Sequence, residues 1–374
     1  MTHLPLYPIE SPPHLEADSH LGLWHTRFFN QYDTHWSLKE ETAKNDWIKS
    51  VARRCGNEKA LKQQAQRLLA LAEKLNGEVI VCKTSWHFVT GMGLAHPVEN
   101  GLAWHPTLGV PYLAGSGVKG LLRAWMECWG SSPPKQWFGL SKKEGDSKDS
   151  AGELIFFDAI PIEPVRLVAD IMTPHYGKWY EQGHEITGAT IADVLKQPER
   201  LPADWHNPIP VPFLAVREAK LLFIIAQRLS SPLDSKEVKA ATEALKNALQ
   251  FLGAGAKTAA GYGRMEVDEK ALENLQTEHY NKQVEERKAK EMAQMSPFEQ
   301  DIQIILNEGS GVGYLRLLTK LEEGFWQDEA EKKVVAEKIR DLMQQDKAWK
   351  TESKAKKPIK DKDYQRTLKV LKYL

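Results

Sequence analysis

Apolar side chains recur at two different spacings along the chain, and the change between them predicts three segments. In residues 1–76 a Pro-rich leader precedes apolar positions at the three- and four-residue spacing of a helix. The leucines that carry this spacing are Leu61, Leu68, Leu69, Leu71 and Leu75. Asn76 and Gly77 end the pattern, as glycine commonly does after a helix. We therefore expect an N-terminal leader and helical segment.

The second segment, residues 77–268, alternates short apolar runs with two amphipathic stretches. The runs predict β-strands, and they lie at 78–83, 153–159, 165–171, 211–228 and 262–267. The stretches predict helices at 117–129 and 235–251, because their apolar residues repeat at helical spacing. This order fits one or two ferredoxin-like β-α-β-β-α-β units, an order shared with RRM domains that bind RNA. We predict an α+β core, although element order alone does not define a function.

The last segment, residues 269–374, is charge-rich and helical in pattern, and we expect a linker helix followed by a helical extension. From Lys347 to Leu374 the chain has ten Lys or Arg and three Asp or Glu residues, a local excess of seven positive charges. Such a tail can add salt-dependent affinity for RNA. Solvation of a terminal helix, or contact with an acidic neighbour, explains the same charge equally well.

Composition limits the classes of function. The chain of 374 residues carries 50 basic and 50 acidic side chains, so a nucleic-acid site must be a local patch. No apolar run approaches the roughly 20 residues of a membrane span, and the N-terminus lacks the pattern of a secretory signal. Cys55, Cys82 and Cys128 are too far apart to suggest a disulfide framework or a zinc site. We expect a cytoplasmic protein with no cofactor and no membrane partner.

A glycine-rich segment near the end of the core is the clearest candidate site. It has two Gly-x-Gly pairs, a lysine between them and an arginine after them: Gly253, Gly255, Lys257, Gly261, Gly263 and Arg264. Glycine permits positive φ and close approach to a ligand, and successive N–H groups in such a loop can bind an anion. The spacing fits neither a Walker A loop nor a dinucleotide fingerprint. We predict a phosphate-binding loop; the alternative is a plain turn between a helix and a strand.

A second phosphate-binding platform is predicted at the start of the first core helix. Gly115, Ser116 and Gly117 open that helix, where free N–H groups and the helix dipole favour anions. Lys119 and Arg123 are four residues apart and therefore share a helix face. The alternative is an ordinary N-cap at Ser116 with two solvated basic side chains.

Together the two motifs resemble the RAMP superfamily of CRISPR-associated RNA-binding subunits. That superfamily has a C-terminal loop of pattern G-h-G-x5-G-h-G with a basic spacer residue, and residues 253–263 match it position for position. Type III members also carry a Pro-x-x-x-Gly-Ser-Ser-hydrophobic-Lys-Gly helix start, which residues 111–120 resemble with Gly117 in place of the second serine. Residues 152–159 and 170–176 are similar to the sixth subunit of the Cmr complex, the type III-B effector.

The resemblance implies a RAMP core and a non-catalytic, RNA-binding role in a ribonucleoprotein that uses a CRISPR RNA (crRNA) guide against invader transcripts. The implied partners are the guide, held toward its 3′ end, the target RNA, the repeated backbone subunit and the small helical subunit. By the same resemblance Lys119, Arg123, Lys257 and Arg264 would contact guide phosphates.

Histidines around the glycine-rich region 91–109 leave an enzymatic alternative open. Some RAMP relatives are metal-independent endoribonucleases that process repeat RNA with a histidine as general acid or base. His87, His96 and His105 are candidates for that role, for contact with a base, or for a structural role in the loop. Trp104, in the same region, is the candidate for stacking on a base.

Two further alternatives concern metals and protein partners. Asp158, Asp170 and His175 could converge, but they lack short metal-ligand spacing, and we interpret them as core-edge or loop residues without a metal. A protein-only scaffold, in which residues 296–374 dock a partner and RNA is incidental, is the third class of function considered.

Overall fold

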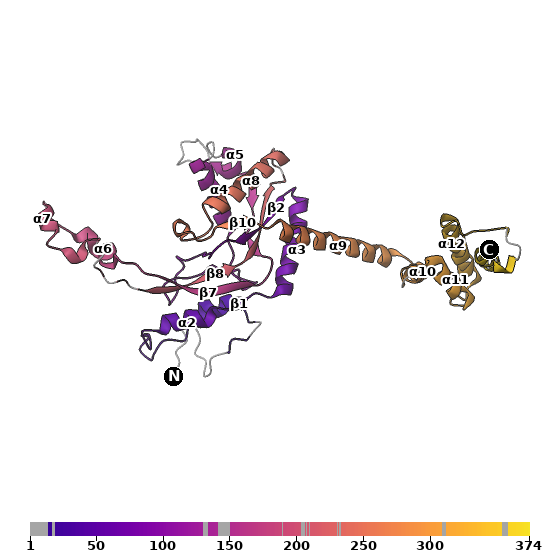
Figure 1. Cartoon of the computed structure of the whole chain (residues 1–374), viewed down its shortest axis with the longest axis horizontal. Helices are drawn as coiled ribbons and strands as arrows, with labels where there is room; N and C mark the ends of the chain where they lie inside the picture. Colours follow the sequence, from indigo (N-terminus) through magenta and orange to yellow (C-terminus); the bar gives the residue numbers. More distant parts are fainter. Residues whose placement is uncertain are drawn as a thin grey trace. The chain divides into compact units, whose positions relative to one another are not determined.

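The chain forms two compact units, Met1–His279 and Tyr280–Leu374, and helix α9 (Glu269–Gln294) contains the boundary between them (Figure 1). The computed structural model describes residues 14–16, 19–129, 134–140, 150–188, 190–202, 206, 208, 210–229, 231, 233–308, 312–353 and 358–374. The start of the predicted Pro-rich leader, residues 1–13, lies outside the described residues.

Two antiparallel sheets form the centre of the first unit. The larger sheet has the order β10 (Met265–Val267), β2 (Glu78–Thr84), β9 (Lys220–Gln227) and β5 (Leu154–Phe156), with β6 (Ile160–Pro161) also paired to β9. The second sheet has the order β1 (Arg54–Cys55), β7 (Val165–Met172) and β8 (Val211–Glu218). A short pair, β3 (Gly139–Leu140) and β4 (Ser150–Ala151), stands apart from both. The expected mixture of helices and strands is therefore present, and the strand pairs are antiparallel.

The long apolar run at 211–228 crosses from one sheet to the other. Its first half, β8, pairs with β7, whereas its second half, β9, pairs with β2. The two halves meet at Ala219, which is itself buried. A strand that is covered on both faces has no polar face to show in the sequence, so the run gives no sign of the division.

Helices cover both faces of the larger sheet. On one face, α4 (Gly115–Trp129) and α8 (Ser235–Phe251) pack against alternate residues of the central strands, including Ile80 and Phe223. On the other face, α3 (Glu58–Lys74) packs against Val81 and Leu222, the neighbouring residues in the two strands. Because successive strand residues point to opposite faces, this alternation places the sheet between two helical layers.

The remaining elements of the first unit are short. Helices α1 (Leu21–Arg27) and α2 (Ala43–Val51) precede the sheets, and α5 (Lys135–Phe138) lies before β3. Between β7 and β8 the chain forms α6 (Gly177–Gln182), η2 (Gly183–Glu185), α7 (Ile191–Val194) and η3 (Pro198–Arg200), at the far end of the two strands (Figure 1). Among the helices described, none has the length and apolar character needed to cross a membrane.

The second unit is entirely helical in its described part. It contains α10 (Pro297–Asn307), α11 (Gly313–Glu322), α12 (Glu329–Gln345), η5 (Pro358–Lys360) and α13 (Lys362–Val370). Leu317, Val335, Ile339, Met343 and Val370 are fully or almost fully buried in a core of its own. A capping box between Ser296 and Glu299 fixes the start of α10.

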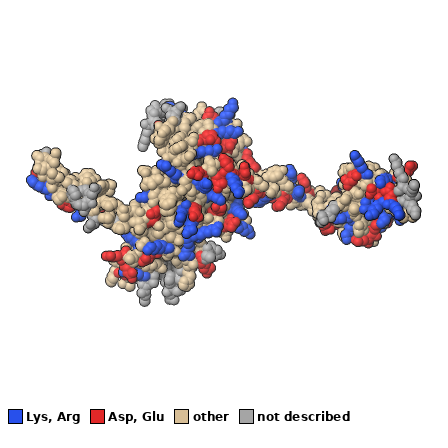
Figure 2. Space-filling view, in the orientation of Figure 1, with Lys and Arg blue, Asp and Glu red and all other residues tan. Residues whose placement is uncertain are grey.

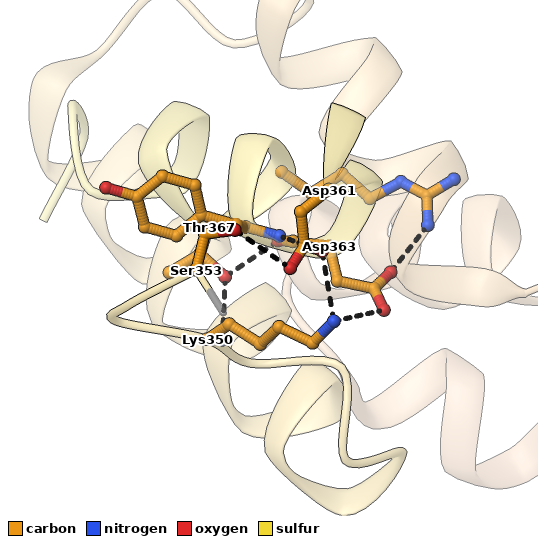
Figure 3. Close-up of polar contacts among 7 residues, drawn as sticks. Lys350, Ser353, Asp361, Asp363 and Thr367 are labelled. Carbon is orange, nitrogen blue, oxygen red and sulfur yellow. Dashed lines mark hydrogen bonds and ion pairs between the residues drawn. The ribbon is translucent and has the colours of Figure 1, made fainter. Parts of the chain in front are cut away.

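A polar network closes the end of this unit and accounts for part of the basic tail (Figure 3). The Lys350 ammonium lies 3.0 Å from the Asp361 carboxylate and 3.5 Å from that of Asp363. Arg366 also pairs with Asp363, at 3.0 Å, and Lys369 pairs with Glu322 at 2.8 Å. These three basic residues of the tail therefore have acidic partners within the unit, which supports a structural role for them.

Candidate nucleic-acid interface

Acidic and basic side chains are interspersed on the face of the first unit shown in Figure 2. Charge alone therefore does not mark a nucleic-acid site on this face, and the contacts of individual residues are needed to find one. The glycine-rich loop joins α8 to β10 and packs along the segment that follows β2. The Ala256 amide donates to the Val89 carbonyl at 2.8 Å, and the Gly263 amide donates to the His87 carbonyl at 2.7 Å. The loop is therefore held against residues 87–89 by its main chain.

The glycines of the loop allow close backbone contacts within the protein. All four have positive φ, as the sequence predicts. At Gly255, with φ of +86°, an added Cβ would lie 2.0 Å from the Val89 carbonyl oxygen. At Gly261, with φ of +90°, nothing lies within 4 Å of the same position. Gly255 is required by packing and by backbone conformation, whereas Gly261 is required by backbone conformation alone.

Three amides remain open at the tip of this loop. The N–H groups of Lys257, Thr258 and Ala259 donate to no acceptor in the part of the chain that is described, while seven other amides of residues 253–264 donate to carbonyls of the loop, of α8 or of residues 87–89. Lys257 adopts the left-handed conformation, with φ of 59°, immediately before η4 (Thr258–Ala260). Consecutive amides at such a turn form a concavity that binds anions. The predicted phosphate-binding surface is thereby reduced to the tip of the loop.

The Lys257 ammonium lies over two aromatic rings and 4.0 Å from the Met172 sulfur. It is 5.5 Å from the ring centre of Phe213 and 5.9 Å from that of Tyr262. No carboxylate lies within 4.0 Å of it among the residues with described positions. A cation held over aromatic rings keeps its charge available to a further anion. Arg264, the second predicted cation, is exposed at the start of β10.

A histidine, an aspartate and a tyrosine meet next to this lysine. His87 Nδ1 donates to Asp170 Oδ2 at 2.9 Å, and the Tyr262 hydroxyl donates to the same oxygen at 2.6 Å. The bond through Nδ1 fixes the ring and leaves Nε2 without a partner among the described residues. No local sequence pattern predicts this cluster, because 83 and 92 positions separate Asp170 from its two partners.

The pKa values in this cluster favour a charged aspartate and a neutral tyrosine. Burial opposes ionisation of Asp170, but hydrogen bonds from Tyr262, His87 and the Ile171 amide outweigh it and hold the pKa of Asp170 below its usual value. Burial, together with the hydrogen bond and negative charge of Asp170, raises the pKa of Tyr262 to about 12. At neutral pH, Tyr262 is therefore a hydrogen-bond donor and not a base.

Trp86 adds an exposed aromatic surface that was not predicted from the sequence. Its ring stacks on His87 with centroids 4.4 Å apart, and 55% of the residue is exposed. Trp104, which was selected, is half-buried against α1: its Nε1 donates to His25 Nδ1 at 3.2 Å. The difference in exposure depends on tertiary packing and has no signal in the sequence. Trp86 is thus better placed than Trp104 for stacking on a base.

The other two candidate histidines have structural partners. His96 donates through Nε2 to the His25 carbonyl at 2.8 Å and accepts through Nδ1 from the Val98 amide. His105 Nδ1 accepts from backbone amides that follow it in the loop, and burial lowers the pKa of its ring. These contacts support the structural alternative for both residues, and they distinguish His87 from them.

The predicted platform at the start of α4 is partly occupied by the protein itself. The Gly115 amide donates to Asp158 Oδ1 at 2.7 Å, and the Gly117 amide donates to the Ala114 carbonyl. A carboxylate therefore already lies at this helix N-terminus, which is a position that favours negative charge. Ser116 is exposed beside it.

The two basic residues of α4 differ in their contacts. Arg123 forms an ion pair with Glu127 at 2.9 Å, whereas Lys119 has no ion pair with any described residue. Near the other end of this helix, Trp125 stacks on Phe251, two residues before the glycine loop. Gly115 is ten residues from Trp125, or about 15 Å along the helix. The start of α4 thus lies about 15 Å along the helix from the residue that contacts the end of α8.

The metal candidates belong to other contacts in this structure. Asp158 accepts from Gly115, and Asp170 belongs to the cluster with His87. Within the described residues, no group of three His, Cys, Asp or Glu side chains is placed to hold a metal ion.

Comparison with known proteins gives one family. A model of the RAMP superfamily matches residues 79–266, about half of the chain. The Cmr6 subunit of the CRISPR Cmr system from Pyrococcus furiosus is 38% identical over 135 residues, which are 34% of this chain and 32% of that protein. The Cmr6 subunit from Saccharolobus solfataricus is 31% identical over 83 residues, which are 21% of this chain and 27% of that protein. The matched regions thus span a third or less of these curated relatives.

Two solved structures were also similar. A chain of the type III-B Cmr-beta complex bound to cognate target RNA has 19% identity and a TM-score of 0.43, covering 60% of this chain and 71% of that one. The crystal structure of Cmr6 from Pyrococcus furiosus has 25% identity and a TM-score of 0.29, and the match covers 51% of this chain and 98% of that one.

Proposed function

Since this chain belongs to the RAMP superfamily, we propose that it is a non-catalytic, RNA-binding subunit of a type III-B CRISPR effector. Its sequence similarity to Cmr6 subunits supports the assignment to that effector. In this role it holds the crRNA guide toward the 3′ end, next to the backbone and small helical subunits, while target RNA pairs with the guide. Such an effector would act in the cytoplasm.

We also assign the larger sheet and its helices to a ferredoxin-like unit. Strand order β10-β2-β9-β5, with α4 after β2 and α8 after β9, supports this assignment. In sequence order the six elements run strand, helix, strand, strand, helix, strand. The glycine loop then precedes the last strand of the unit, at an edge of the sheet.

The observation that carries the proposal is the open tip of this loop. Three consecutive amides, at residues 257–259, and the Lys257 ammonium all lack an anionic partner among the described residues. Amides and a cation in this arrangement suit a phosphate group, and phosphate contacts give affinity with little sequence preference. The exposed ring of Trp86 lies on His87, whose backbone carbonyl holds the loop, and offers a stacking surface for a base.

The test is the salt dependence of binding to a labelled single-stranded crRNA. Loss of one phosphate contact lowers the slope of log K against log salt by about 0.7, which corresponds to about fivefold weaker binding at 0.1 M salt. Lys257→Ala should show both effects. Lys288→Ala, on the exposed surface of α9, removes the same charge elsewhere and should show neither. If Lys257→Ala and its control behave alike, the loop is not the RNA contact.

The cluster of His87, Asp170 and Tyr262 supports a second candidate, a metal-independent endoribonuclease. Asp170 orients the imidazole so that Nε2 could accept a proton from a ribose hydroxyl, with Lys257 near the developing phosphate charge. Purified protein incubated with repeat RNA in the presence of a chelator decides between the two. Cleavage that is abolished by His87→Ala and retained in Lys288→Ala would favour the enzyme. Intact RNA with unchanged binding would favour the non-catalytic subunit.

A further inference from the structure

A basic groove lies apart from the glycine loop, where the two sheets of the first unit meet. It has a volume of about 870 Å³. Five basic side chains line it, together with two acidic ones, so it has a local excess of three positive charges. The basic residues are Arg53, Arg54, Lys83, Arg166 and Lys220, and the acidic ones are Glu163 and Glu218.

Four of these cations form two like-charge pairs across neighbouring strands. Arg54 of β1 lies directly opposite Arg166 of β7, and Lys83 of β2 lies directly opposite Lys220 of β9. Directly opposite residues in antiparallel strands point to the same face, with Cβ atoms about 5 Å apart, and like charges there destabilise the sheet. The repulsion within the two pairs has to be offset by acidic neighbours or by a bound anion.

The acidic side chains only partly compensate this repulsion. Lys220 lies 3.3 Å from Glu163, and Lys83 lies 3.9 Å from Glu266. Both arginines of the other pair are exposed and have no ion pair with a described residue. Glu218 is opposite Arg166 in the ladder, but its recorded ion pair is with Arg217, at 3.9 Å. Glu218 therefore offsets part of the charge of Arg166, whereas Arg54 has no acidic residue opposite it in the ladder.

A backbone irregularity shapes the groove at the same point. The register of β7 and β8 shifts between Arg166 and Leu167, and the Leu167 amide donates to the Arg53 carbonyl at 2.9 Å. A bulge of this kind re-aims side chains and is common at binding sites. Small and apolar residues, among them Ala52, Pro164 and Ala219, form part of the wall between the charges. Long basic side chains can therefore reach a ligand without steric competition.

We propose that this groove binds the phosphate backbone of single-stranded RNA as a second contact, independent of the glycine loop. Guanidinium groups bind phosphate through two parallel hydrogen bonds, and two adjacent arginines fit consecutive phosphates of one strand. The groove also leads toward the loop: Thr84 lies opposite Met265, and the Ser85 amide donates to the Arg264 carbonyl at 2.9 Å. One strand could thus contact both. This inference rests on the proposed RNA-binding function.

The test uses the full chain, a labelled single-stranded RNA of about 30 nucleotides and a salt series. Arg54→Gln with Arg166→Gln removes two phosphate contacts, so the salt slope should fall by about 1.4 and binding at 0.1 M salt should weaken about 25-fold. Lys288→Gln with Lys290→Gln removes two exposed charges of α9 as the matched control. The arginine variant should unfold at about the same temperature as the parent, because it relieves the repulsion between the arginines and also loses the attraction between Arg166 and Glu218. If it misfolds, Lys83→Gln with Lys220→Gln tests the same groove through its second pair.

The outcomes separate this proposal from the general one. Weaker binding in the groove variant and in Lys257→Ala supports both contacts. Weaker binding in Lys257→Ala alone, with the groove variant equal to its control, overturns the groove and leaves RNA binding intact. A parent chain that binds no RNA overturns both. If the groove variant keeps its RNA affinity but loses binding to poly-glutamate, the groove serves an acidic protein and the RNA assignment is wrong.

Discussion

Replacing two glycines of the loop one at a time separates packing from backbone conformation. Gly255→Ala and Gly261→Ala both place an L-residue at positive φ, which costs about 1–2 kcal/mol of folding free energy. The Gly261 variant has open space for its new methyl group, so it should lose only this amount. The Gly255 variant would place Cβ at 2.0 Å from the Val89 carbonyl oxygen, so the backbone has to move.

That movement has a calculable cost. It breaks the 2.8 Å hydrogen bond from the Ala256 amide to Val89, a residue that is fully buried. Leaving a buried carbonyl without its donor costs about 1–3 kcal/mol. The total for Gly255→Ala is then about 3 kcal/mol or more. With about 2 °C of Tm per kcal/mol for a domain of this size, we expect losses of about 6 °C for Gly255→Ala and about 3 °C for Gly261→Ala.

Thermal unfolding of the full chain, followed by circular dichroism, measures the difference. RNA binding at 0.1 M salt should weaken in the Gly255 variant, since the open tip moves with the loop, and should persist in the Gly261 variant. Equal losses of Tm in the two variants would refute the packing argument. A Gly255 variant as stable as the parent would show that the loop does not lie against residues 87–89.

Three further predictions concern titration and packing. Burial, and the nearby charge of His96, lower the pKa of His25, so the unfolded chain takes up the proton first as the pH falls. The free energy of unfolding should therefore fall below pH 6.5 by up to about 1.4 kcal/mol per pH unit. Urea unfolding at several pH values should show a weaker pH dependence of this free energy in His25→Gln. The raised pKa of Tyr262 gives the fold a stability that is complete below pH 10 and is lost as the pH rises through about 12. Burial also raises the pKa of Tyr314, so ultraviolet titration should show late-ionising tyrosines whose number falls by one in Tyr262→Phe, and one of them should shift toward pH 10 in Asp170→Asn. Leu317→Ala should destabilise the second unit by about 2–5 kcal/mol without changing RNA affinity, which differential scanning calorimetry and the binding assay would check.

Local elements of the fold were accessible from the sequence because they depend on local spacing. The strand predicted at 78–83 corresponds to β2, and the helix predicted at 235–251 has the same bounds as α8. The positive φ of the loop glycines also followed from residue type. The division of residues 211–228 at Ala219 did not, since it depends on which sheet covers each half.

The site was harder to predict than the fold, because its contacts join distant residues. The sequence indicated an open glycine loop, whereas six of the twelve amides of residues 253–264 donate to the loop itself or to residues 87–89. Trp86 is exposed and Trp104 is half-buried, although the two have similar sequence surroundings. Arg54 and Arg166 are 112 positions apart and meet only through the pairing of β1 with β7. Predicting such contacts requires strand register, which a single sequence does not supply.

Photo-crosslinking of RNA to the natively purified assembly, with the attached peptides mapped by mass spectrometry, tests the central claim most directly. We predict a co-purifying short RNA, crosslinked to residues 253–264 and to Trp86, two residues after β2. An assembly without RNA, or crosslinks confined to Tyr280–Leu374, would contradict the assignment of the glycine loop as an RNA contact.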